Sequence, residues 1–550
     1  MLQIIPAPKS RPAKMTCLGL ILLTILNLSL AFIGELPTAR ADTPHFMTTQ
    51  GDRLVINGQT VILKGTNFYP LGNSFTAMWM YWDSEAVRQG LQQAAALGDN
   101  SVRILVPFSS IYGWTQPGSG YVVPEYLDRL RQFVQLAGEY RLGVIITLFD
   151  FEDVSGPGTK EELYHRQYAH DIVTAFKDDD RVIAWDLHNE PDNYGLWNSQ
   201  DNAEPTLVWL SRMRQYVKSL DPNHLITVGM GKRESFYRQS SEGYTVLDLS
   251  DFVSEHSYNA DALAEEIYEL QGKTNRQKPI VIEEMGWPSG PVFSTDFTEA
   301  AQVDKYYKTL EVAKSHNVAG ILQWMLYDAE PTGAPPWDDI GSYYGLVKRN
   351  GQLKPAAQVW QTNFVADPLP TPVTTTNLAL TKAAPKVNPP HYFPATDHYL
   401  GTPMYEMWRR GGAELIFGLP LTDAFLQEDV GSGRHDFVND PVKTPMYQYF
   451  EKGRMEYHKE RRALPEYSTL QGIDRYLFLI DFGNVGLELA AVRGYNFAPA
   501  TQLGANSATY QWFTQTSHSL QEPFLSFWQQ HLGNYIFGSP ISEPFEETNP

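Results

Sequence analysis

The chain has 550 residues, of which 43% are hydrophobic and 13% aromatic, and its formal net charge is −20. This length exceeds one ordinary hydrophobic core, so at least two folded domains are expected. Lys and Arg form no block beyond the N-terminus, which excludes the basic surface typical of nucleic-acid-binding proteins. We therefore expect no nucleic-acid partner, and the acidic balance suits an uncharged or cationic one.

The first 41 residues have the pattern of an export signal. Three basic residues between positions 9 and 14 precede an apolar run at 18–33, and Ala39-Arg40-Ala41 follows as a small-x-small cleavage site. We expect cleavage after Ala41 and a secreted protein. An uncleaved membrane anchor is the alternative, although the run is shorter than the roughly 20 residues that span a bilayer. The only cysteine, Cys17, would leave with the signal, so the mature chain would hold no disulfide.

Eight short apolar runs, each typical of a buried parallel strand, alternate with helical patterns along the first two thirds of the chain. The runs cover residues 61–67, 101–108, 143–149, 181–187, 224–230, 251–258, 279–285 and 319–326. Helical spacing is clearest at 84–97, with Gly98 as a stop, and at 126–140. This α/β alternation predicts a closed (β/α)8 TIM barrel. The alternative, a doubly wound sheet, lacks its Gly-rich phosphate turn after the first strand.

Segments outside these repeats set the domain boundaries. Residues 53–64 predict an N-terminal hairpin that turns at Asn57-Gly58 and closes the N-terminal end of the barrel. We place the barrel domain at 45–362. Residues 363–390 are rich in Pro, Thr and Ala without a sustained amphipathic period, and this composition predicts a stiff, extended linker. A C-terminal region, residues 391–550, follows.

The C-terminal region contains an internal repeat. Residues 393–425 and 513–545 align without a gap at an offset of 120 residues, the spacing of Trp408 and Trp528. The first copy continues through 447–458. We expect a small α+β fold whose aromatic residues form a plain core, with a sugar-stacking platform or a cell-surface contact as the alternative. The repeats resemble aromatic-rich modules appended to exported bacterial proteins.

Two predicted strand ends carry carboxylates. Asn189-Glu190-Pro191 follows the fourth run, and Glu283-Glu284 ends the seventh. Barrel enzymes hold their reacting groups at the C-terminal ends of the strands. Hydrolysis of a glycosidic bond needs one carboxyl group to protonate the leaving oxygen and another to support the developing positive charge, at about 5 to 5.5 Å for retention. Strand alternation places Glu283 and Glu284 on opposite faces.

Six motifs, in order, resemble glycoside hydrolase family 5 of clan A. They are KGTNFYP from Lys64, NSVRIL from Asn100, WDLHNEP from Trp185, HSY from His256, EEMGW from Glu283 and LQWML from Leu322. The resemblance covers residues 45–362 and implies that Glu190 is the acid/base and Glu284 the nucleophile. The GWPSG segment after Glu284 is also similar to the β-1,3-glucanases of family 17, so the choice of sugar stays open.

The resemblance further implies five substrate-binding residues, namely Arg103, Asn189, His256, Tyr258 and Trp324. Arg103 would keep the nucleophile ionised, and Tyr258 would donate a hydrogen bond to it. Asn189 would contact the hydroxyl next to the reacting carbon, His256 would contact substrate, and Trp324 would stack beneath the sugar. The alternatives are a salt bridge elsewhere for Arg103, a helix cap for Asn189 and core packing for the other three.

One position departs from the family. Many members carry His at the end of the third strand, where this chain has Phe149-Asp150-Phe151, so substrate contacts on that side differ. Trp79, Trp82 and Trp114 fall in predicted loops after the first two strands. We expect them to be candidate sugar platforms on the catalytic face.

The sequence therefore predicts a secreted retaining β-glycosidase that hydrolyses a β-glycan, mannan or glucan, by double displacement. No cofactor is expected, and no His/Cys/Asp cluster has the spacing of a metal site. The alternative is a non-catalytic carbohydrate-binding or surface-attached protein with a degenerate barrel. Against it stand Arg103, Asn189, Glu190 and Glu284, because a retired site has no reason to keep polar groups that are costly to bury. The sequence leaves the sugar, the choice of endo or exo action and the oligomeric state open.

Overall fold

The computed structural model describes residues 44–154, 156, 158–292, 294–330, 340–386, 389–426 and 446–546. The predicted signal segment and Cys17 lie outside these residues. Within the described part of the chain, no helix is long and apolar enough to cross a membrane.

Eight parallel strands form a closed barrel, as the sequence predicts. They are β4 (Leu63–Asn67), β5 (Ser101–Leu105), β6 (Gly143–Thr147), β7 (Val182–Asn189), β8 (Leu225–Met230), β9 (Val253–His256), β10 (Ile280–Met285) and β11 (Gly320–Gln323). Each strand pairs with the next in chain order, and β11 pairs with β4 to close the ring. Almost every strand residue is buried, which explains why the strands read as continuous apolar runs.

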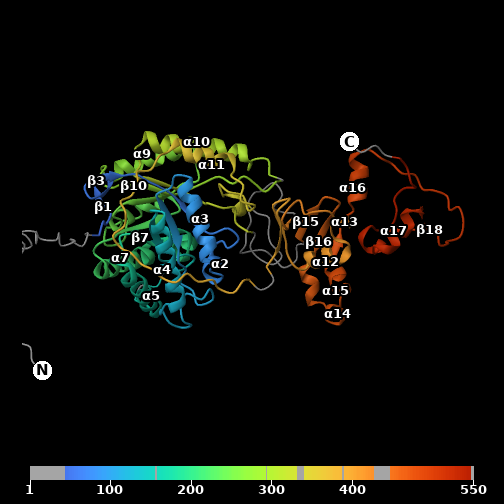
Figure 1. Ribbon diagram of the computed structural model, residues 1–550, viewed down its shortest axis with the longest axis horizontal. Coiled ribbons are helices and arrows are strands. Elements are labelled where there is room, and N and C mark those ends of the chain that lie inside the picture. Colours follow the sequence, from blue (N-terminus) through green and yellow to red (C-terminus); the bar gives the residue numbers. More distant parts are fainter. Residues whose placement is uncertain are drawn as a thin grey trace, which may run out of the picture. The chain divides into compact units, whose positions relative to one another are not determined.

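Helices surround the barrel, shown in blue through green to yellow in Figure 1. The longer ones are α3 (Ser84–Ala96), α4 (Pro124–Glu139), α5 (Lys160–Phe176), α7 (Glu204–Leu220), α9 (Leu263–Lys273), α10 (Glu299–Ser315) and α11 (Pro355–Asn363), and the shorter ones are α2 (Thr76–Met80), η1 (Pro191–Asn193), α6 (Gly195–Gln200), η2 (Arg233–Tyr237), α8 (Val246–Leu249) and η3 (Ile340–Tyr343). The helices predicted at 84–97 and 126–140 are confirmed. The Asp83 side chain caps α3, and Gly98, with φ of 84°, follows its C-terminus.

A three-stranded antiparallel sheet precedes the barrel. It consists of β1 (Thr48–Gln50), β2 (Arg53–Ile56) and β3 (Gln59–Val61). The predicted hairpin turn is confirmed, because Asn57 and Gly58 both have positive φ, as a two-residue turn of this kind requires. The first strand was not predicted. Leu54 and Val61 pack with Ile145 of β6, so the sheet covers apolar residues of the barrel strands.

The segment after the barrel is extended but fixed to the barrel surface. The Asp180 carboxylate accepts hydrogen bonds from the backbone N–H groups of Val373 at 2.8 Å and Thr374 at 3.0 Å. The same carboxylate accepts one from the N–H of His45 at 3.2 Å. Residues 373–374 of the predicted linker therefore form part of the barrel's surface layer.

The C-terminal region is α+β, and both repeats contain the same elements. The first has β12 (His391–Phe393), β13 (His398–Leu400), α12 (Met404–Gly411) and α13 (Ala413–Ile416), and the second has β18 (Tyr510–Phe513), β19 (His518–Gln521), α17 (Phe524–Gln530) and α18 (Gly533–Ile536). The Trp408 indole N–H donates to the Gly418 carbonyl at 2.8 Å, and that of Trp528 to Gly538 at 2.8 Å. The internal repeat is thus visible in structure as well as in sequence.

Further elements cover the first repeat. They are β14 (Phe425–Leu426), β15 (Met446–Phe450), β16 (Gly453–Tyr457), η5 (Lys459–Ala463), α14 (Pro465–Thr469), α15 (Asp474–Leu479), β17 (Ile480–Phe482) and α16 (Val485–Val492), with β14 to β17 in one antiparallel sheet. Phe417 packs against Phe450 and Phe482 and is 3% exposed. Its equivalent in the second repeat, Phe537, is 43% exposed.

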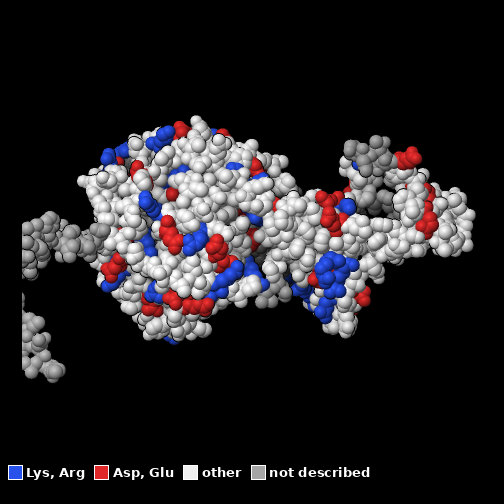
Figure 2. All heavy atoms as spheres, in the orientation of Figure 1, with Lys and Arg blue, Asp and Glu red and all other residues white. Residues whose placement is uncertain are grey.

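Charged side chains of both signs are interspersed over the barrel face drawn in Figure 2. The interior of the barrel, by contrast, holds charged groups that the surface view does not show, and these form the site described next.

Candidate active site

Glu190 lies directly after β7, at the C-terminal end of the barrel. The pairing of β7 with β8 shifts register between Asp186 and Asn189, so the side chains of both residues, three positions apart, reach the same buried cluster. Glu190 itself has φ of 45° and ψ of 55°, a left-handed conformation that is uncommon outside glycine. Non-glycine residues in this conformation concentrate at functional sites, where the surrounding structure holds them.

A second register shift places both glutamates of β10 inside the barrel. The pairing of β10 with β9 shifts between Ile282 and Glu284. Simple alternation predicts opposite faces for Glu283 and Glu284, and this prediction is wrong because the shift turns both side chains inward. The result is two adjacent carboxylates in contact with Arg103: Glu284 Oε1 lies 2.6 Å from its Nη1, and Glu283 Oε2 lies 3.5 Å from its Nε.

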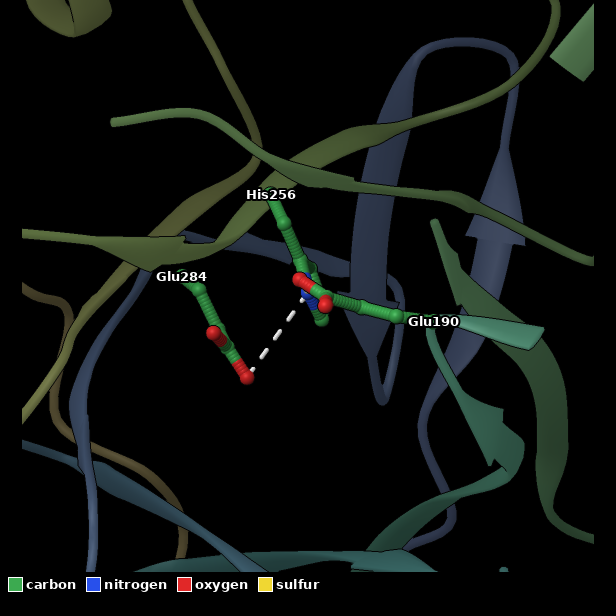
Figure 3. A group of neighbouring side chains, drawn as sticks. All are labelled: Glu190, His256 and Glu284. Atoms are coloured by element: carbon green, nitrogen blue, oxygen red, sulfur yellow. Dashed lines mark hydrogen bonds and ion pairs between the residues drawn. The ribbon is translucent and has the colours of Figure 1, made fainter. Parts of the chain in front are cut away.

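The two predicted catalytic carboxylates converge. One carboxylate oxygen from Glu190, one from Glu284 and a ring nitrogen of His256 all lie within 4.8 Å of one another. Figure 3 shows Glu190 and Glu284 approaching from opposite sides, with the His256 ring between them. The side chain of Glu190 is 21% exposed and that of Glu284 is 6% exposed, so both remain accessible from the barrel mouth.

Arg103 on β5 holds the Glu284 side of the site. Its guanidinium is fully buried and donates to Glu284 Oε1 at 2.6 Å, to Asp186 Oδ2 at 2.8 Å and to Asn189 Oδ1 at 2.8 Å. Burial lowers the pKa of Arg103, but the charges of Glu283, Asp186 and Glu284 raise it by more, so the group stays protonated. The predicted neighbourhood of Arg103 and Glu284 is confirmed.

Tyr258 completes the contacts of Glu284. Its hydroxyl donates to Glu284 Oε2 at 2.7 Å, so each oxygen of the carboxylate accepts a hydrogen bond. Burial raises the pKa of Tyr258, and the charge of Glu284 raises it further, so the phenol remains a donor. The Tyr344 ring lies edge-on to Tyr258 at 5.7 Å and fixes its orientation.

His256 lies among three carboxylates rather than at the surface of the site. Its Nδ1 is 2.9 Å from Glu190 Oε1, and its Nε2 is 3.6 Å from Glu283 Oε2. Burial lowers the pKa of His256, but Glu284, Glu190 and Glu283 together raise it well above its usual value. Because the ring has no exposed surface, we assign His256 to holding Glu190 in place of the predicted direct contact with substrate.

The protonated His256 acts on Glu190 in return. Burial raises the pKa of Glu190, but its hydrogen bond to His256 and the positive charge of that ring lower it by more, with Asn193 Nδ2 contributing another hydrogen bond at 2.7 Å. Both directions favour a protonated His256 beside an ionised Glu190.

Negative charge exceeds positive charge in this cluster. Arg103 and His256 supply two cations, and four carboxylates surround them, namely Asp186, Glu190, Glu283 and Glu284. Fixed negative charge in a buried site stabilises a positive charge that develops on a substrate. The cluster therefore suits a cation-like transition state such as that of glycoside cleavage.

The donor set of Glu190, His256 and Glu284 has the spacing of a metal site, but its protonation does not suit one. A histidine binds a metal ion only through its neutral imidazole. The three neighbouring carboxylates keep the His256 ring protonated, and its Nδ1 already lies at hydrogen-bond distance from Glu190. This arrangement therefore suits a proton shared between His256 and Glu190 better than a metal ion.

Trp324 lies directly after β11, beside the carboxylates in the ring of strands. It is half-buried, and its ring contacts Tyr69 at 5.9 Å and Phe75 at 6.3 Å. These aromatic neighbours support the indole from the β4 side. Its remaining exposed face is available to a ligand.

The three tryptophans predicted as sugar platforms are buried, and that prediction is wrong. Trp79, Trp82 and Trp114 are at most 1% exposed. Trp79 stacks on Trp82 at 5.9 Å, lies edge-on to Trp114 at 5.0 Å and packs against Phe133 of α4. The loops after β4 and β5 fold back over α4, because burying large aromatic rings is worth more than exposing them.

Two site residues, Asp186 and Glu283, are not among those predicted from the sequence. Asp186 stands inside the apolar run of β7, and burial raises its pKa to about 6 against the opposing charge of Arg103. An ionisable residue in such a run is itself a signal, because it requires a buried partner. Glu283 also stands in an apolar run, but its inward direction depends on the irregular pairing of β10 with β9.

Comparison with known proteins finds a matching family model, similar proteins and similar solved structures. Residues 57–330 match the family model described as cellulase (glycosyl hydrolase family 5). The chain is 25% identical over 385 residues to a probable mannan endo-1,4-beta-mannosidase A of Aspergillus flavus, covering 61% of this chain and 95% of the relative. It is 26% identical over 357 residues to a putative mannan endo-1,4-beta-mannosidase 9 of Oryza sativa, covering 55% and 84%. Among solved structures, the endo-1,4-beta-mannanase from Rhizomucor miehei matches with a TM-score of 0.42 and 20% identity, covering 51% of this chain and 90% of that one.

Proposed function

The barrel of this chain belongs to glycosyl hydrolase family 5 and is a glycoside hydrolase, and we propose that it cleaves β-1,4-linked mannan with retention of configuration. The observation that carries the proposal is the approach of Glu190 and Glu284, whose nearest oxygens lie within 4.8 Å. Retaining enzymes hold their carboxyl groups about 5 to 5.5 Å apart, whereas inverting enzymes leave room for a water at about 6.5 to 9.5 Å.

The first step uses Glu284 as the nucleophile. Arg103 and Tyr258 donate to its two oxygens and aim the carboxylate into the site. Glu284 attacks the anomeric carbon and forms an ester, the bond from that carbon to the leaving oxygen breaks, and Glu190 transfers a proton to that oxygen. Asn189 contacts the hydroxyl next to the reacting carbon, and Trp324 supports the sugar ring.

Glu190 must be protonated for this step, and its environment explains how. In the empty site His256 holds the proton, 2.9 Å from Glu190 Oε1. A bound sugar excludes water from the partly exposed carboxylate, and desolvation disfavours its charged form. The proton then moves from His256 Nδ1 to Glu190. In the second step Glu190 takes a proton from water, whose oxygen attacks the anomeric carbon and breaks the ester.

The functions described for the relatives support mannan over glucan as the substrate class. The relatives from Aspergillus flavus and Oryza sativa are both described as mannan endo-1,4-beta-mannosidases. The test must therefore measure activity on glucan beside activity on mannan.

Hydrolysis of mannohexaose, followed by proton NMR, tests the stereochemistry. We expect the β-anomer as first product. Glu284→Gly should abolish hydrolysis of mannan, and added azide should restore turnover of an aryl β-mannoside as the α-mannosyl azide. Glu283→Gly is the matched control, because it removes an adjacent buried carboxylate.

Three results would contradict the proposal. Azide rescue of Glu283→Gly in place of Glu284→Gly would show that Glu283 is the nucleophile. A wild type active only on β-1,4- or β-1,3-glucan would correct the substrate class and leave the carboxylate pair intact. A wild type inactive on all three polymers would favour a non-catalytic protein.

We also propose that the protein is exported and that residues 1–41 are removed. The basic segment, apolar run and Ala39-Arg40-Ala41 site support this. Expression with the native N-terminus should yield a secreted protein that begins at Asp42. A cell-bound product that retains residue 18 would indicate an anchor.

The second C-terminal repeat is proposed to contact polysaccharide. Phe524, Phe527 and Tyr535 are 56%, 44% and 63% exposed, and exposed rings can stack on sugars. Replacing all three with Ala should reduce activity on insoluble mannan and leave activity on soluble mannan unchanged. Equal activity on both forms would contradict this role.

A further inference from the structure

The turn after β6 points one polar side chain into the site and one ring out of it. Phe149 packs against Tyr168 of α5 and Trp209 of α7, two of the helices that surround the barrel. Asp150 is 8% exposed, whereas Phe151 is 71% exposed and has φ of 57°. A left-handed conformation is sterically unfavourable for a residue as large as Phe, so the surrounding structure must impose it. The chain bends at Asp150 and Phe151.

Asp150 is connected to the catalytic machinery through Asn189. Asn189 Nδ2 donates to Asp150 Oδ1 at 3.0 Å, and Asn189 Oδ1 accepts from Arg103 Nη2 at 2.8 Å. These two contacts settle which way round the amide lies, with its oxygen toward Arg103 and its nitrogen toward Asp150. The second hydrogen of Asn189 Nδ2 is left for the sugar.

The other oxygen of Asp150 is open. Among the described residues, no hydrogen-bond donor reaches Oδ2, and this oxygen is not sealed from solvent. Burial raises the pKa of Asp150 to about 7; Asn189 and Arg103 oppose this, and Glu284 and Glu190 add to it. Tyr194 lies near the same three carboxyl groups, and burial followed by the charges of Asp150, Glu190 and Glu284 raises its pKa. Asp150 is thus within electrostatic reach of both catalytic carboxylates.

A buried carboxyl group is costly to keep without a partner. Asp150 Oδ2 can accept hydrogen bonds that no described residue donates, and Asp150 Oδ1 is hydrogen-bonded to Asn189, which the proposed function places at the substrate. Sugar hydroxyl groups are donors of the kind that this oxygen lacks.

We propose that Asp150 is a further substrate-binding residue, which accepts a hydrogen bond through Oδ2 from a hydroxyl of the sugar at the cleavage point while Oδ1 holds Asn189. This inference rests on the proposed glycosidase function. The matching hydroxyl is a neighbour of the one that Asn189 contacts, because Asn189 Nδ2, the donor to that hydroxyl, is itself hydrogen-bonded to Asp150.

The test pairs Asp150→Asn with altered substrates. The substrates are 4-nitrophenyl β-mannobioside and its analogues that each lack one hydroxyl on the sugar next to the nitrophenyl group. On the full substrate, Asp150→Asn should lower kcat/KM by about 10- to 100-fold, the loss typical of a hydrogen bond to a charged group. One analogue should show this penalty with the wild-type enzyme and little further loss with Asp150→Asn. That non-additivity identifies the hydroxyl held by Asp150.

Asp99→Asn is the matched control. Asp99 is also 8% exposed, burial raises its pKa to about 7, and Trp360 Nε1 donates to it at 2.8 Å. Its charge partner is Lys64, outside the catalytic cluster. We expect Asp99→Asn to change the melting temperature without selecting among the analogues.

The possible outcomes distinguish a failure of the role of Asp150 from a failure of the proposed glycosidase function. Removal of a hydroxyl could lower kcat/KM by the same factor in Asp150→Asn as in the wild type for every analogue. In that case Asp150 contacts no hydroxyl and the inference is overturned, while the proposed function stands. If the wild type hydrolyses none of these glycosides and no β-mannan or β-glucan, the proposed function fails and the inference fails with it.

Discussion

Glu283 offers the sharpest test of the electrostatics of this site. It is fully buried, lies 3.6 Å from His256 and 3.5 Å from Arg103, and accepts a hydrogen bond from the Ser254 hydroxyl. Glu283→Gln preserves shape and removes one negative charge. Two unit charges about 4 Å apart interact by roughly 4 kcal/mol at an effective dielectric constant of about 20. Since 1.36 kcal/mol corresponds to one pKa unit, the pKa of His256 should fall by about two to three units.

The fall has a consequence for catalysis. Above its lowered pKa, His256 is neutral and no longer depresses the pKa of Glu190. The alkaline limb of the kcat/KM profile, which follows loss of the proton from the free enzyme's acid, should change position in the variant. We also expect kcat at the optimum to fall by about 10- to 100-fold, because less negative charge faces the cation-like transition state.

Two measurements check this reasoning. NMR titration of ring-labelled histidine, with His256→Gln to assign the resonance, reports the pKa directly, and the pH dependence of kcat/KM reports its effect. Glu255→Gln is the control: Glu255 is 2% exposed on the neighbouring strand, but burial raises its pKa to about 8, so it is mostly uncharged at pH 7. An unchanged His256 titration in Glu283→Gln would refute the argument.

Three further predictions follow from other parts of the barrel. Tyr258→Phe removes the 2.7 Å hydrogen bond to Glu284 and should lower kcat by about 10- to 100-fold with little change in KM; a rise in KM at constant kcat would mean that the hydroxyl serves binding instead. Trp79→Ala should cost about 3 to 5 kcal/mol in urea unfolding, with no specific effect on KM, because the ring is 1% exposed; normal stability with a raised KM would place it at the substrate after all. Asp150→Asn should stabilise the protein at pH 8. The folded state keeps the Asp150 proton up to about pH 7 whereas the unfolded chain loses it near pH 4, so stability is lost as pH rises through this window, by roughly 4 kcal/mol for three pKa units. Equal melting temperatures of variant and wild type at pH 8 would show that Asp150 carries no such penalty.

The barrel and its carboxylates could be predicted because they depend on local patterns. A strand buried on both faces must be apolar throughout, so β6 and β10 are visible in the sequence without any knowledge of their neighbours. Polar residues that end such runs, as Glu190 and Glu284 do, are equally visible. The hairpin at Asn57-Gly58 follows from the positive φ that both residues tolerate.

The remaining features depend on tertiary structure. The direction of Glu283 follows from a register shift between β10 and β9, which alternation within one strand cannot reveal. The burial of Trp79 and Trp114 follows from the packing of two loops over α4, and their predicted loop positions were compatible with either outcome. The inward direction of Asp150 depends on the left-handed Phe151, a conformation that sequence preference argues against.

The hydrogen bonds at Asp180 join two segments of the chain that no disulfide connects. The mature chain is expected to contain no cysteine, so it has no covalent cross-link with which to fasten its ends. The Asp180 carboxylate instead accepts hydrogen bonds from the backbone at residue 45 and at residues 373–374, which are more than three hundred positions apart. Burial raises the pKa of Asp180, and these N–H groups lower it by more, so the hydrogen bonds are present at neutral pH and are lost in acid as the carboxylate takes up a proton. A barrel shortened to residue 362 would lose two of these three hydrogen bonds, and a minimal catalytic fragment should extend beyond Thr374.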